Sequence, residues 1–210
     1  PVPADICRSL QTFEITGLAG VPPLWAQLLQ RASPFSTLSF PHLRYITNSG
    51  GVFPKPLLAR YRELLPSTEV VLMYGLTEAF RSTYLPPEEL DRRPDSMGRA
   101  IPETEILVVD DEGRRCAPGE IGELVHAGPT VSLGYWRNEE ASREKWRPHP
   151  FDPSRDERVV YSGDLVRMDE EGFLYFVSRR DQMLKCYGFR VSPEDVEEQL
   201  HASGLVHEVV

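Results

Sequence analysis

The chain has 210 residues, of which 40% are hydrophobic and 26% are charged, and its formal net charge is −9 at pH 7. The length suits one large domain, or one domain with part of another, and the composition allows a substantial core. The acidic balance argues against nucleic acid as a partner, because a nucleic-acid-binding face is basic. No apolar run approaches the ~20 residues of a membrane-spanning helix, so we expect no membrane span.

The first part of the chain alternates between helix-like and strand-like segments. Residues 1–33 show helical periodicity with a break at Pro22, which predicts a short strand and turn followed by a helix from about Leu24. The segment 42–51, HLRYITNSGG, predicts a strand that runs into a glycine loop.

The next two segments continue this alternation. Residues 56–66, PLLARYRELLP, predict a helix closed by Pro66. The continuous apolar run EVVLMYG at 69–75 is typical of a strand buried on both faces. Alternating strands and helices favour a parallel sheet, so we expect an α/β fold, with a partial α/β subdomain over 1–99.

The pattern changes near Gly98 to short strands separated by glycine and proline. Residues 104–114 predict a strand that enters a turn, and residues 119–128 predict a second strand. We therefore expect a small β-rich subdomain over 100–178. The charged segment 137–158 predicts a short helix and an exposed loop, with no assigned chemistry.

The last part of the chain contains a predicted hairpin. Residues 159–180, VVYSGDLVRMDEEGFLYFVSRR, predict strand, turn and strand, with MDEEG as the tip. Residues 184–200, LKCYGFRVSPEDVEEQL, predict a short strand and then a helix that begins at Ser192.

The cysteines are few and far apart. Cys7, Cys116 and Cys186 form no CxxC pair, so we expect neither a disulfide framework nor a zinc site. Reduced thiols are the default of the cytosol, which predicts a cytoplasmic protein.

Two loops follow predicted strands at the edge where parallel sheets bind ligands, NSGG at 48–51 and YGLTE at 74–78. Tyr74 could stack on a flat ring. Thr77 could donate to a phosphate oxygen, and Glu78 is a hard oxygen ligand for Mg²⁺. The alternative is a buried strand end with a capped turn, which this stretch alone slightly favours.

Two further clusters could bind a nucleotide. In SGD at 162–164, we expect Asp164 on a turn between strands, where it could accept hydrogen bonds from both ribose hydroxyls. An aspartate that satisfies its own turn is the commoner alternative. Four cations also fall within twelve residues of this acidic chain, and they indicate either an anion site or a solvated surface: Arg179, Arg180, Lys185 and Arg190.

Four segments resemble motifs of the adenylate-forming superfamily, the AMP-forming acyl- and aryl-CoA ligases and their relatives. YGLTE resembles YGxTE, and YSGDL resembles Y-[ST]-G-D. RRDQMLKCYGFRVSPEDVE is similar to GRxDxxIKxxGxRIxPxEIE, and GRAIPETEILVVDDEGRRCAPGEIGEL resembles GxPxPxxxxxIVDxxGxxxPxGExGEL. The motifs keep the family order and cover nearly the whole chain. Residues 78–109 and 128–136 are most similar to a bacterial subgroup associated with exopolysaccharide and exosortase gene clusters.

The resemblance implies a two-step reaction. A carboxylate attacks the α-phosphate of ATP to give an acyl-adenylate and pyrophosphate, and the thiol of coenzyme A then displaces AMP to form a thioester. ATP, AMP, Mg²⁺ and coenzyme A are thus the implied cofactors and co-substrates, and a small carboxylic acid is the implied substrate.

The resemblance also implies roles for single residues in the first half-reaction. The backbone at Gly50 and Gly51 would border the adenine, and Tyr74, with Gly75 after it, would stack on the ring. Thr77 would contact the phosphate and Glu78 would bind Mg²⁺. Asp164 and Arg179 would contact the ribose. Trp25 would lie near the acyl pocket.

At the C-terminal side, the resemblance implies a hinge over 179–181, with Asp181 as its pivot, and the start of a mobile α+β domain over 182–210. Lys185, as a catalytic cation, and Arg190 would lie near the nucleotide phosphates. Gly188 would line the approach of the thiol.

Some features depart from the family pattern. Ser178 stands where the family has glycine, and the lysine-bearing phosphate loop and the C-terminal catalytic lysine are not found. We therefore expect a part of a longer enzyme, inactive by itself, whose unpaired sheet edges favour association. Two alternatives stay open: an adenylation domain that loads a carrier protein, and a catalytically incomplete nucleotide-binding fragment. YGLTE lacks the proline of YGPTE, which favours the acyl ligases.

Overall fold

The computed structural model describes residues 2–181, 184–186, 189–191, 196 and 200. The chain divides into two compact units, which are described separately. The first comprises Pro1–Leu76 and Arg81–Arg99, and the second comprises Thr77–Phe80 and Ala100–Val210. The short segment Thr77–Phe80 thus belongs with the second unit, although it follows the third strand of the first.

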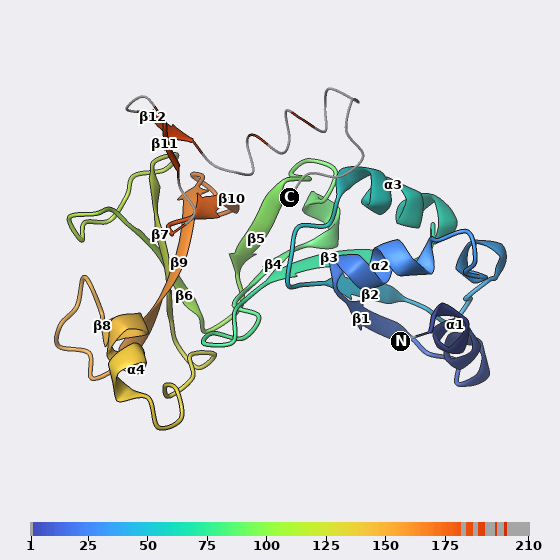
Figure 1. Ribbon diagram of the computed structural model, residues 1–210, viewed down its shortest axis with the longest axis horizontal. Coiled ribbons are helices and arrows are strands. Elements are labelled where there is room, and N and C mark those ends of the chain that lie inside the picture. Colours follow the sequence, from blue (N-terminus) through green and yellow to red (C-terminus); the bar gives the residue numbers. More distant parts are fainter. Residues whose placement is uncertain (1, 182–183, 187–188, 192–195, 197–199, 201–210) are drawn as a thin grey trace. The chain divides into compact units, whose positions relative to one another are not determined.

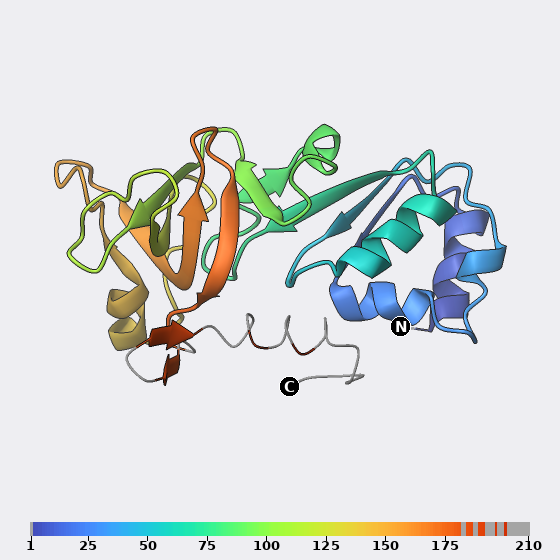
Figure 2. The ribbon, with the colours of Figure 1, turned by 90° about the horizontal axis from the view of Figure 1, so that it is seen from above.

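The first unit is built on a parallel sheet. Its strands β1 (Gly17–Gly20), β2 (Tyr45–Asn48) and β3 (Glu69–Tyr74) pair in that order, with Leu18, Ile46 and Val70 in register. The helices between the strands lie on one face of the sheet (Figures 1 and 2), as the usual right-handed crossover predicts for two successive connections that run the same way. The predicted α/β fold with a parallel sheet is confirmed.

The three α-helices of this unit have proline at or next to their first residue. They are α1 (Pro3–Thr12), α2 (Pro22–Leu28) and α3 (Lys55–Leu64), and each has proline in its first turn. Proline is tolerated there because the first N–H groups of a helix have no partner within the helix. For this reason α2 begins at Pro22, two residues before the predicted start.

An aromatic cluster forms the core beneath the helices. The ring of Trp25 packs against Phe53 at 6.0 Å and Tyr61 at 5.3 Å between centroids, and the Tyr61 hydroxyl donates to the Trp25 carbonyl at 2.8 Å. A Cβ atom at Gly20 would lie 2.5 Å from the Trp25 ring, so only glycine fits there. Burial of each such ring contributes roughly 1.5–3 kcal/mol to folding.

The prediction that β3 is buried on both faces is wrong. Only Val70 is buried, and the four residues that follow it are half-buried. The physical reason is that α2 and α3 cover only one face. Beyond β3 the sheet continues through two strands that were not predicted, β4 (Thr83–Leu85), which is antiparallel to β3, and β5 (Ser96–Ala100). A short 3₁₀ turn, Pro87–Glu89, lies between β4 and β5.

The second unit is mainly an antiparallel sheet in the order β6 (Glu105–Val109), β7 (Ile121–Ala127), β9 (Arg158–Met168) and β10 (Leu174–Arg179). The predicted hairpin of β9 and β10 is confirmed. The predicted short helix is α4 (Glu139–Lys145). It leads into β8 (Trp146–Pro148), which pairs with the start of β9.

Aliphatic side chains from the neighbouring strands form the core of this sheet: Leu107, Val109, Val125, Ala127 and Val159. A separate hairpin joins β11 (Leu184–Cys186) and β12 (Phe189–Val191). The helix predicted from Ser192 lies outside the described residues. In the described part of the chain, no helix is long and apolar enough to cross a membrane.

Candidate nucleotide site

The SGD segment lies inside β9, so the prediction of a turn there is wrong. On the β7 side, Tyr161 pairs with Val125 and Leu165 pairs with Glu123, which leaves residues 162–164 opposite a single residue. This is a β-bulge, and Gly163 has the positive φ of 81° that it requires. The pairing on both sides keeps the segment within the strand, and the sequence pattern did not reveal that pairing.

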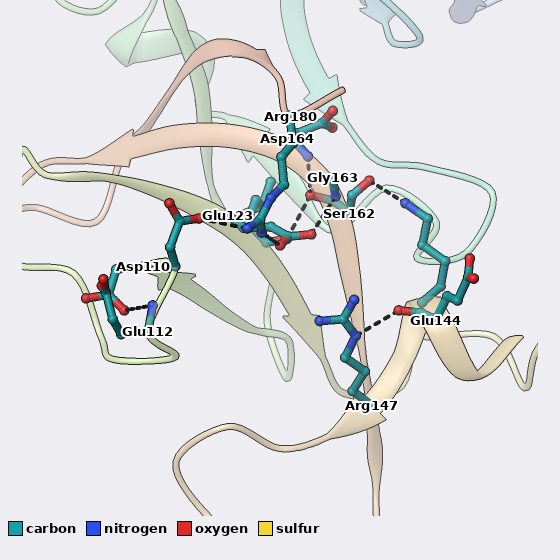
Figure 3. A network of polar contacts seen from close by, with 12 residues as sticks. Asp110, Glu112, Glu123, Glu144, Arg147, Ser162, Gly163, Asp164 and Arg180 are labelled. Carbon is teal, nitrogen blue, oxygen red and sulfur yellow. Dashed lines mark hydrogen bonds and ion pairs between the residues drawn. The ribbon is translucent and has the colours of Figure 1, made fainter. Parts of the chain in front are cut away.

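The polar groups of the bulge are bonded locally. The Ser162 hydroxyl donates to the Leu124 carbonyl at 2.7 Å and accepts from the Asp164 N–H at 2.9 Å. The Gly163 N–H donates to the Glu123 carboxylate at 3.0 Å (Figure 3). These bonds hold the bulge in one conformation, because buried backbone groups are costly to leave unpaired.

The bulge brings Asp164 next to Arg179. The two residues are cross-strand partners on β9 and β10, and Arg179 Nη1 lies 2.8 Å from Asp164 Oδ1. Asp164 is 6% exposed. Arg179 Nη1 also approaches the Ser162 carbonyl at 3.4 Å, and its Nε lies 3.3 Å from Asp181 Oδ1. The two residues predicted to contact the ribose are therefore brought together.

The next arginine pairs with other carboxylates. Arg180 Nη1 lies 2.5 Å from Glu123 Oε2, whose side chain is 8% exposed (Figure 3). Its Nη2 lies 2.7 Å from Asp111 Oδ1. The Arg180 N–H donates to the Gly163 carbonyl at 2.8 Å. Of the predicted cation cluster, Arg179 and Arg180 are thus both paired with carboxylates.

Lys145 is a residue near the bulge that the sequence did not predict. It ends α4, and its Nζ donates to the Ser162 carbonyl at 3.1 Å. A Cβ atom at Gly163 would lie 3.3 Å from both Lys145 Nζ and Arg179 Nη2. One lysine in a charged helix carries no signal in the sequence that would have distinguished it.

The loop after β3 joins the second unit through main-chain bonds. Buried Ala79 forms an antiparallel bridge with Val131, and the Ser132 N–H donates to the Glu78 carbonyl at 2.8 Å. The Thr77 side chain on this loop is exposed and Glu78 is half-buried.

The carboxylate of Glu78 accepts a hydrogen bond from the Tyr135 hydroxyl through Oε1. This bond, with a smaller effect from burial, raises the pKa of Tyr135 to about 12. Tyr135 therefore stays protonated and acts as a donor at neutral pH. Sequence reasoning missed Tyr135, because 57 residues separate it from Glu78.

The residues predicted to border the adenine belong to the first unit. Gly50 has a φ of 76°, and the Asn48 side-chain amide donates to the Gly51 carbonyl at 2.9 Å, which closes the glycine loop. Tyr74 is the last residue of β3, and Gly75 follows it, both half-buried. The residues predicted to contact the adenine thus belong to the first unit, whereas those predicted to contact the phosphate, the metal and the ribose belong to the second.

The remaining predicted residues differ in their surroundings. Lys185 and Arg190 are backbone register partners in the β11–β12 hairpin, and Gly188 lies outside the described residues. Asp181 is exposed, two residues after β10 ends. Trp25 is fully buried in the aromatic core of the first unit.

Comparison with known proteins settles the family. Residues 1–136 match the family described as AMP-binding enzyme. The chain belongs to the AMP-binding enzyme family. Over 210 residues it is 33% identical to a long-chain-fatty-acid–CoA ligase of Salmonella typhimurium, with 99% of this chain and 36% of that protein covered.

Other relatives act on different acids. An L-proline–[L-prolyl-carrier protein] ligase of Streptomyces coelicolor is 36% identical over 197 residues, with 91% of this chain and 35% of that protein covered. Among solved structures, o-succinylbenzoate coenzyme A synthetase from Bacillus subtilis, in complex with ATP and magnesium ion, is 29% identical with a TM-score of 0.81. That match covers 98% of this chain and 40% of the solved one. The chain thus spans well under half the length of these family members.

Proposed function

We propose that this chain contributes the nucleotide-binding residues of an AMP-forming acid–thiol ligase. The enzyme would activate a carboxylic acid as its acyl-adenylate and transfer the acyl group to coenzyme A. The observation that supports this most is that one compact unit contains both the Glu78 loop and the bulge that pairs Asp164 with Arg179. Both features fall on motifs shared with the family.

In this proposal, Asp164 accepts hydrogen bonds from the ribose hydroxyls and Arg179 donates to the same sugar. Asp164 suits this role because its carboxylate is already restrained by a cation, and restraint lowers the entropic cost of binding. On the adenine side, Gly50 and Gly51 would border the base, and Tyr74, with Gly75 after it, would stack on it.

Glu78 fits a magnesium ion that accompanies ATP. Among the described residues only its Oε1 accepts a hydrogen bond, so Oε2 is available as a hard oxygen ligand. No group of three or more potential metal ligands occurs in the described part of the chain. Mg²⁺ usually takes one or two carboxylates from a protein and completes its shell with phosphates and water, so a single glutamate is a sufficient protein ligand. When bound, Mg²⁺ would stabilise the negative charge that develops on the α-phosphate. Thr77, which is exposed, would donate to the phosphate.

The C-terminal part of the chain, from residue 179 onward, would serve the second step, in which the thioester forms. We propose a hinge at 179–181 with Asp181 as pivot, between the β-rich subdomain over 100–178 and a mobile domain from 182 onward. Lys185 and Arg190 would supply cations to the phosphates, and Gly188 would line the path of the thiol. A cytoplasmic location is also proposed, in agreement with the free, buried thiols of Cys7 and Cys116.

A carrier protein is the second candidate for the thiol partner. The observation in its favour is the 36% identity to a ligase that acts on a carrier protein. Thioester formation with free coenzyme A in the absence of any carrier would decide for the first candidate. The acid itself is to be found with a panel of fatty, aromatic and amino acids, because relatives act on such different substrates.

Exchange of pyrophosphate into ATP tests the proposal in the complete protein that the gene encodes. Wild type should show exchange that depends on Mg²⁺ and on an acid. Glu78→Gln should abolish this exchange, because the amide keeps the shape but loses the charge that holds the metal. Glu140→Gln, at an exposed position of α4, is the matched control and should keep full activity. Undiminished exchange in Glu78→Gln would remove Glu78 from the metal role.

A further inference from the structure

Both the main chain and the ring of Tyr135 are fixed by neighbouring residues, in addition to the bond that its hydroxyl donates to Glu78. Its N–H donates to the Ser142 hydroxyl at 2.9 Å, and that hydroxyl donates to the Asn138 carbonyl at 2.7 Å. Since Asn138 caps the N-terminus of α4, the main chain of Tyr135 is fixed to the start of this helix.

The ring of Tyr135 packs edge-on against Trp146, at 4.8 Å between centroids and an interplanar angle of 89°. Trp146 is itself 3% exposed, pairs with Val160 of β9 and donates from Nε1 to the Ser132 carbonyl at 2.5 Å. An aromatic pair with this geometry restricts both rings, so the direction of the Tyr135 hydroxyl is fixed.

The same loop that carries Tyr135 also holds the main chain of Glu78. Ser132 donates to the Glu78 carbonyl, and Val131 forms a bridge with Ala79. Glu78 is therefore bound at its backbone and at its carboxylate by one segment, residues 131–135. A free glutamate side chain has several rotamers, and the Tyr135 bond selects one of them.

We infer that Tyr135 is a positioning residue for Glu78: its hydroxyl holds Oε1 so that Oε2 is presented to the cation that accompanies the nucleotide. This inference rests on the proposed function. It goes beyond that function by assigning a role to Tyr135, a residue to which the proposed function gives none. Trp146 contributes to this positioning because its ring packs against the ring of Tyr135.

Tyr135→Phe tests this inference, because it removes the hydroxyl and keeps the ring against Trp146. In the complete protein, the Kd for ATP is measured by calorimetry with excess Mg²⁺ and again in EDTA. Tyr135→Phe should raise the Kd with Mg²⁺ about tenfold, the size expected for a hydrogen bond to a charged group. The Kd in EDTA should change less than about twofold, because the nucleotide contacts are intact.

Tyr175→Phe is the matched control. Tyr175 also donates from its hydroxyl to a carboxylate of the same unit, that of Asp169, at 3.2 Å, but at the tip of the β9–β10 hairpin. Tyr175→Phe should leave the Kd for ATP unchanged, both with Mg²⁺ and in EDTA. The thermal unfolding midpoint of each variant separates a loss of positioning from a general loss of stability.

The outcomes distinguish this inference from the proposed function. If wild type binds ATP more tightly with Mg²⁺, Glu78→Gln abolishes that gain and Tyr135→Phe keeps it, the inference is wrong while the proposed function stands. If Tyr135→Phe weakened ATP binding equally with Mg²⁺ and in EDTA, the role of the tyrosine would be merely structural. That result would also overturn the inference. If wild type shows no gain from Mg²⁺, the proposed function fails and the inference fails with it.

Discussion

Asp164 and Arg179 face each other across β9 and β10, with 2.8 Å between the carboxylate and the guanidinium. Both lie on strands rather than on flexible loops, and the bulge around Gly163 fixes the carboxylate further. A carboxylate restrained in this way is suited to recognise a diol, because little freedom remains to be lost on binding.

Asp164→Ala should raise the KM for ATP about tenfold or more, because at least one hydrogen bond to a charged group is lost. The KM for the acid should change much less. Steady-state kinetics of the complete protein with each substrate varied in turn provides the measurement. Asp91→Asn, which disrupts an exposed ion pair with Arg62, is the control. Equal changes in both KM values would contradict a ribose contact.

Gly163→Ala should weaken ATP binding as well as stability. A left-handed residue other than glycine costs about 1–2 kcal/mol, and the new methyl group would press on Lys145 and Arg179. Gly172→Ala is a matched control, because Gly172 has a φ of 82° but no atom within 4 Å of the added Cβ. Urea denaturation should show a similar loss for both variants, whereas calorimetry should show weaker ATP binding for Gly163→Ala alone. If Gly163→Ala bound ATP with the affinity of wild type, the bulge would have no part in nucleotide binding.

Arg180→Met should destabilise the second unit more than Glu123→Gln does. Loss of the arginine leaves the buried Glu123 carboxylate without its cation, at a cost of roughly 1–3 kcal/mol, reduced because Arg180 is half exposed. In Glu123→Gln, the glutamine can still accept a hydrogen bond from the Gly163 N–H, and the arginine that loses its partner is solvated. This variant should therefore lose less than about 1 kcal/mol of stability. Urea denaturation gives both values. The reverse order would mean that the carboxylate is adequately solvated without Arg180.

His126 should make the second unit less stable in acid. Burial on β7 lowers the pKa of His126 to about 3 in the folded state, whereas an unfolded histidine has a pKa near ~6.5. Between these values the unfolded state binds more protons, so stability is complete above pH ~6.5 and falls as the pH decreases. Between pH 7.5 and pH 5 this histidine alone should remove about 2 kcal/mol.

The measurement for His126 is urea denaturation at pH 7.5 and pH 5. His126→Leu should show a smaller loss between the two pH values than wild type, whatever its absolute stability. His42→Gln, at an exposed position of the first unit, should behave as wild type. An unchanged loss in His126→Leu would place the acid sensitivity on other groups.

Features that depend on local sequence were predictable. Proline in the first turn marks α3, and the MDEEG tip marks the hairpin of β9 and β10, because each signal lies within a few residues of its element. The motifs also named Asp164 and Arg179 as partners on one ligand, and the structure pairs them directly.

Features that depend on distant partners were not predictable from one sequence. The bulge at Gly163 exists because the neighbouring strands keep pairing on either side of it. Tyr135 reaches Glu78 across 57 positions, and Lys145 reaches Ser162 across 17. No periodicity or turn signal records such contacts. The partial exposure of β3 was missed for a related reason, since an apolar run does not show which of its faces a helix covers.

The bulge also limits how this motif can change in length. Between Tyr161 and Leu165, β9 advances four positions while β7 advances only two, from Val125 to Glu123. The surplus is even, so the in-and-out order of side chains is the same before and after the bulge. Deletion of one residue would leave two residues opposite Leu124, which is the ordinary form of a β-bulge, so pairing on both sides could continue. It would, however, remove the hydroxyl of Ser162, the left-handed Gly163 or the carboxylate of Asp164, and each of these has a separate task in the bulge.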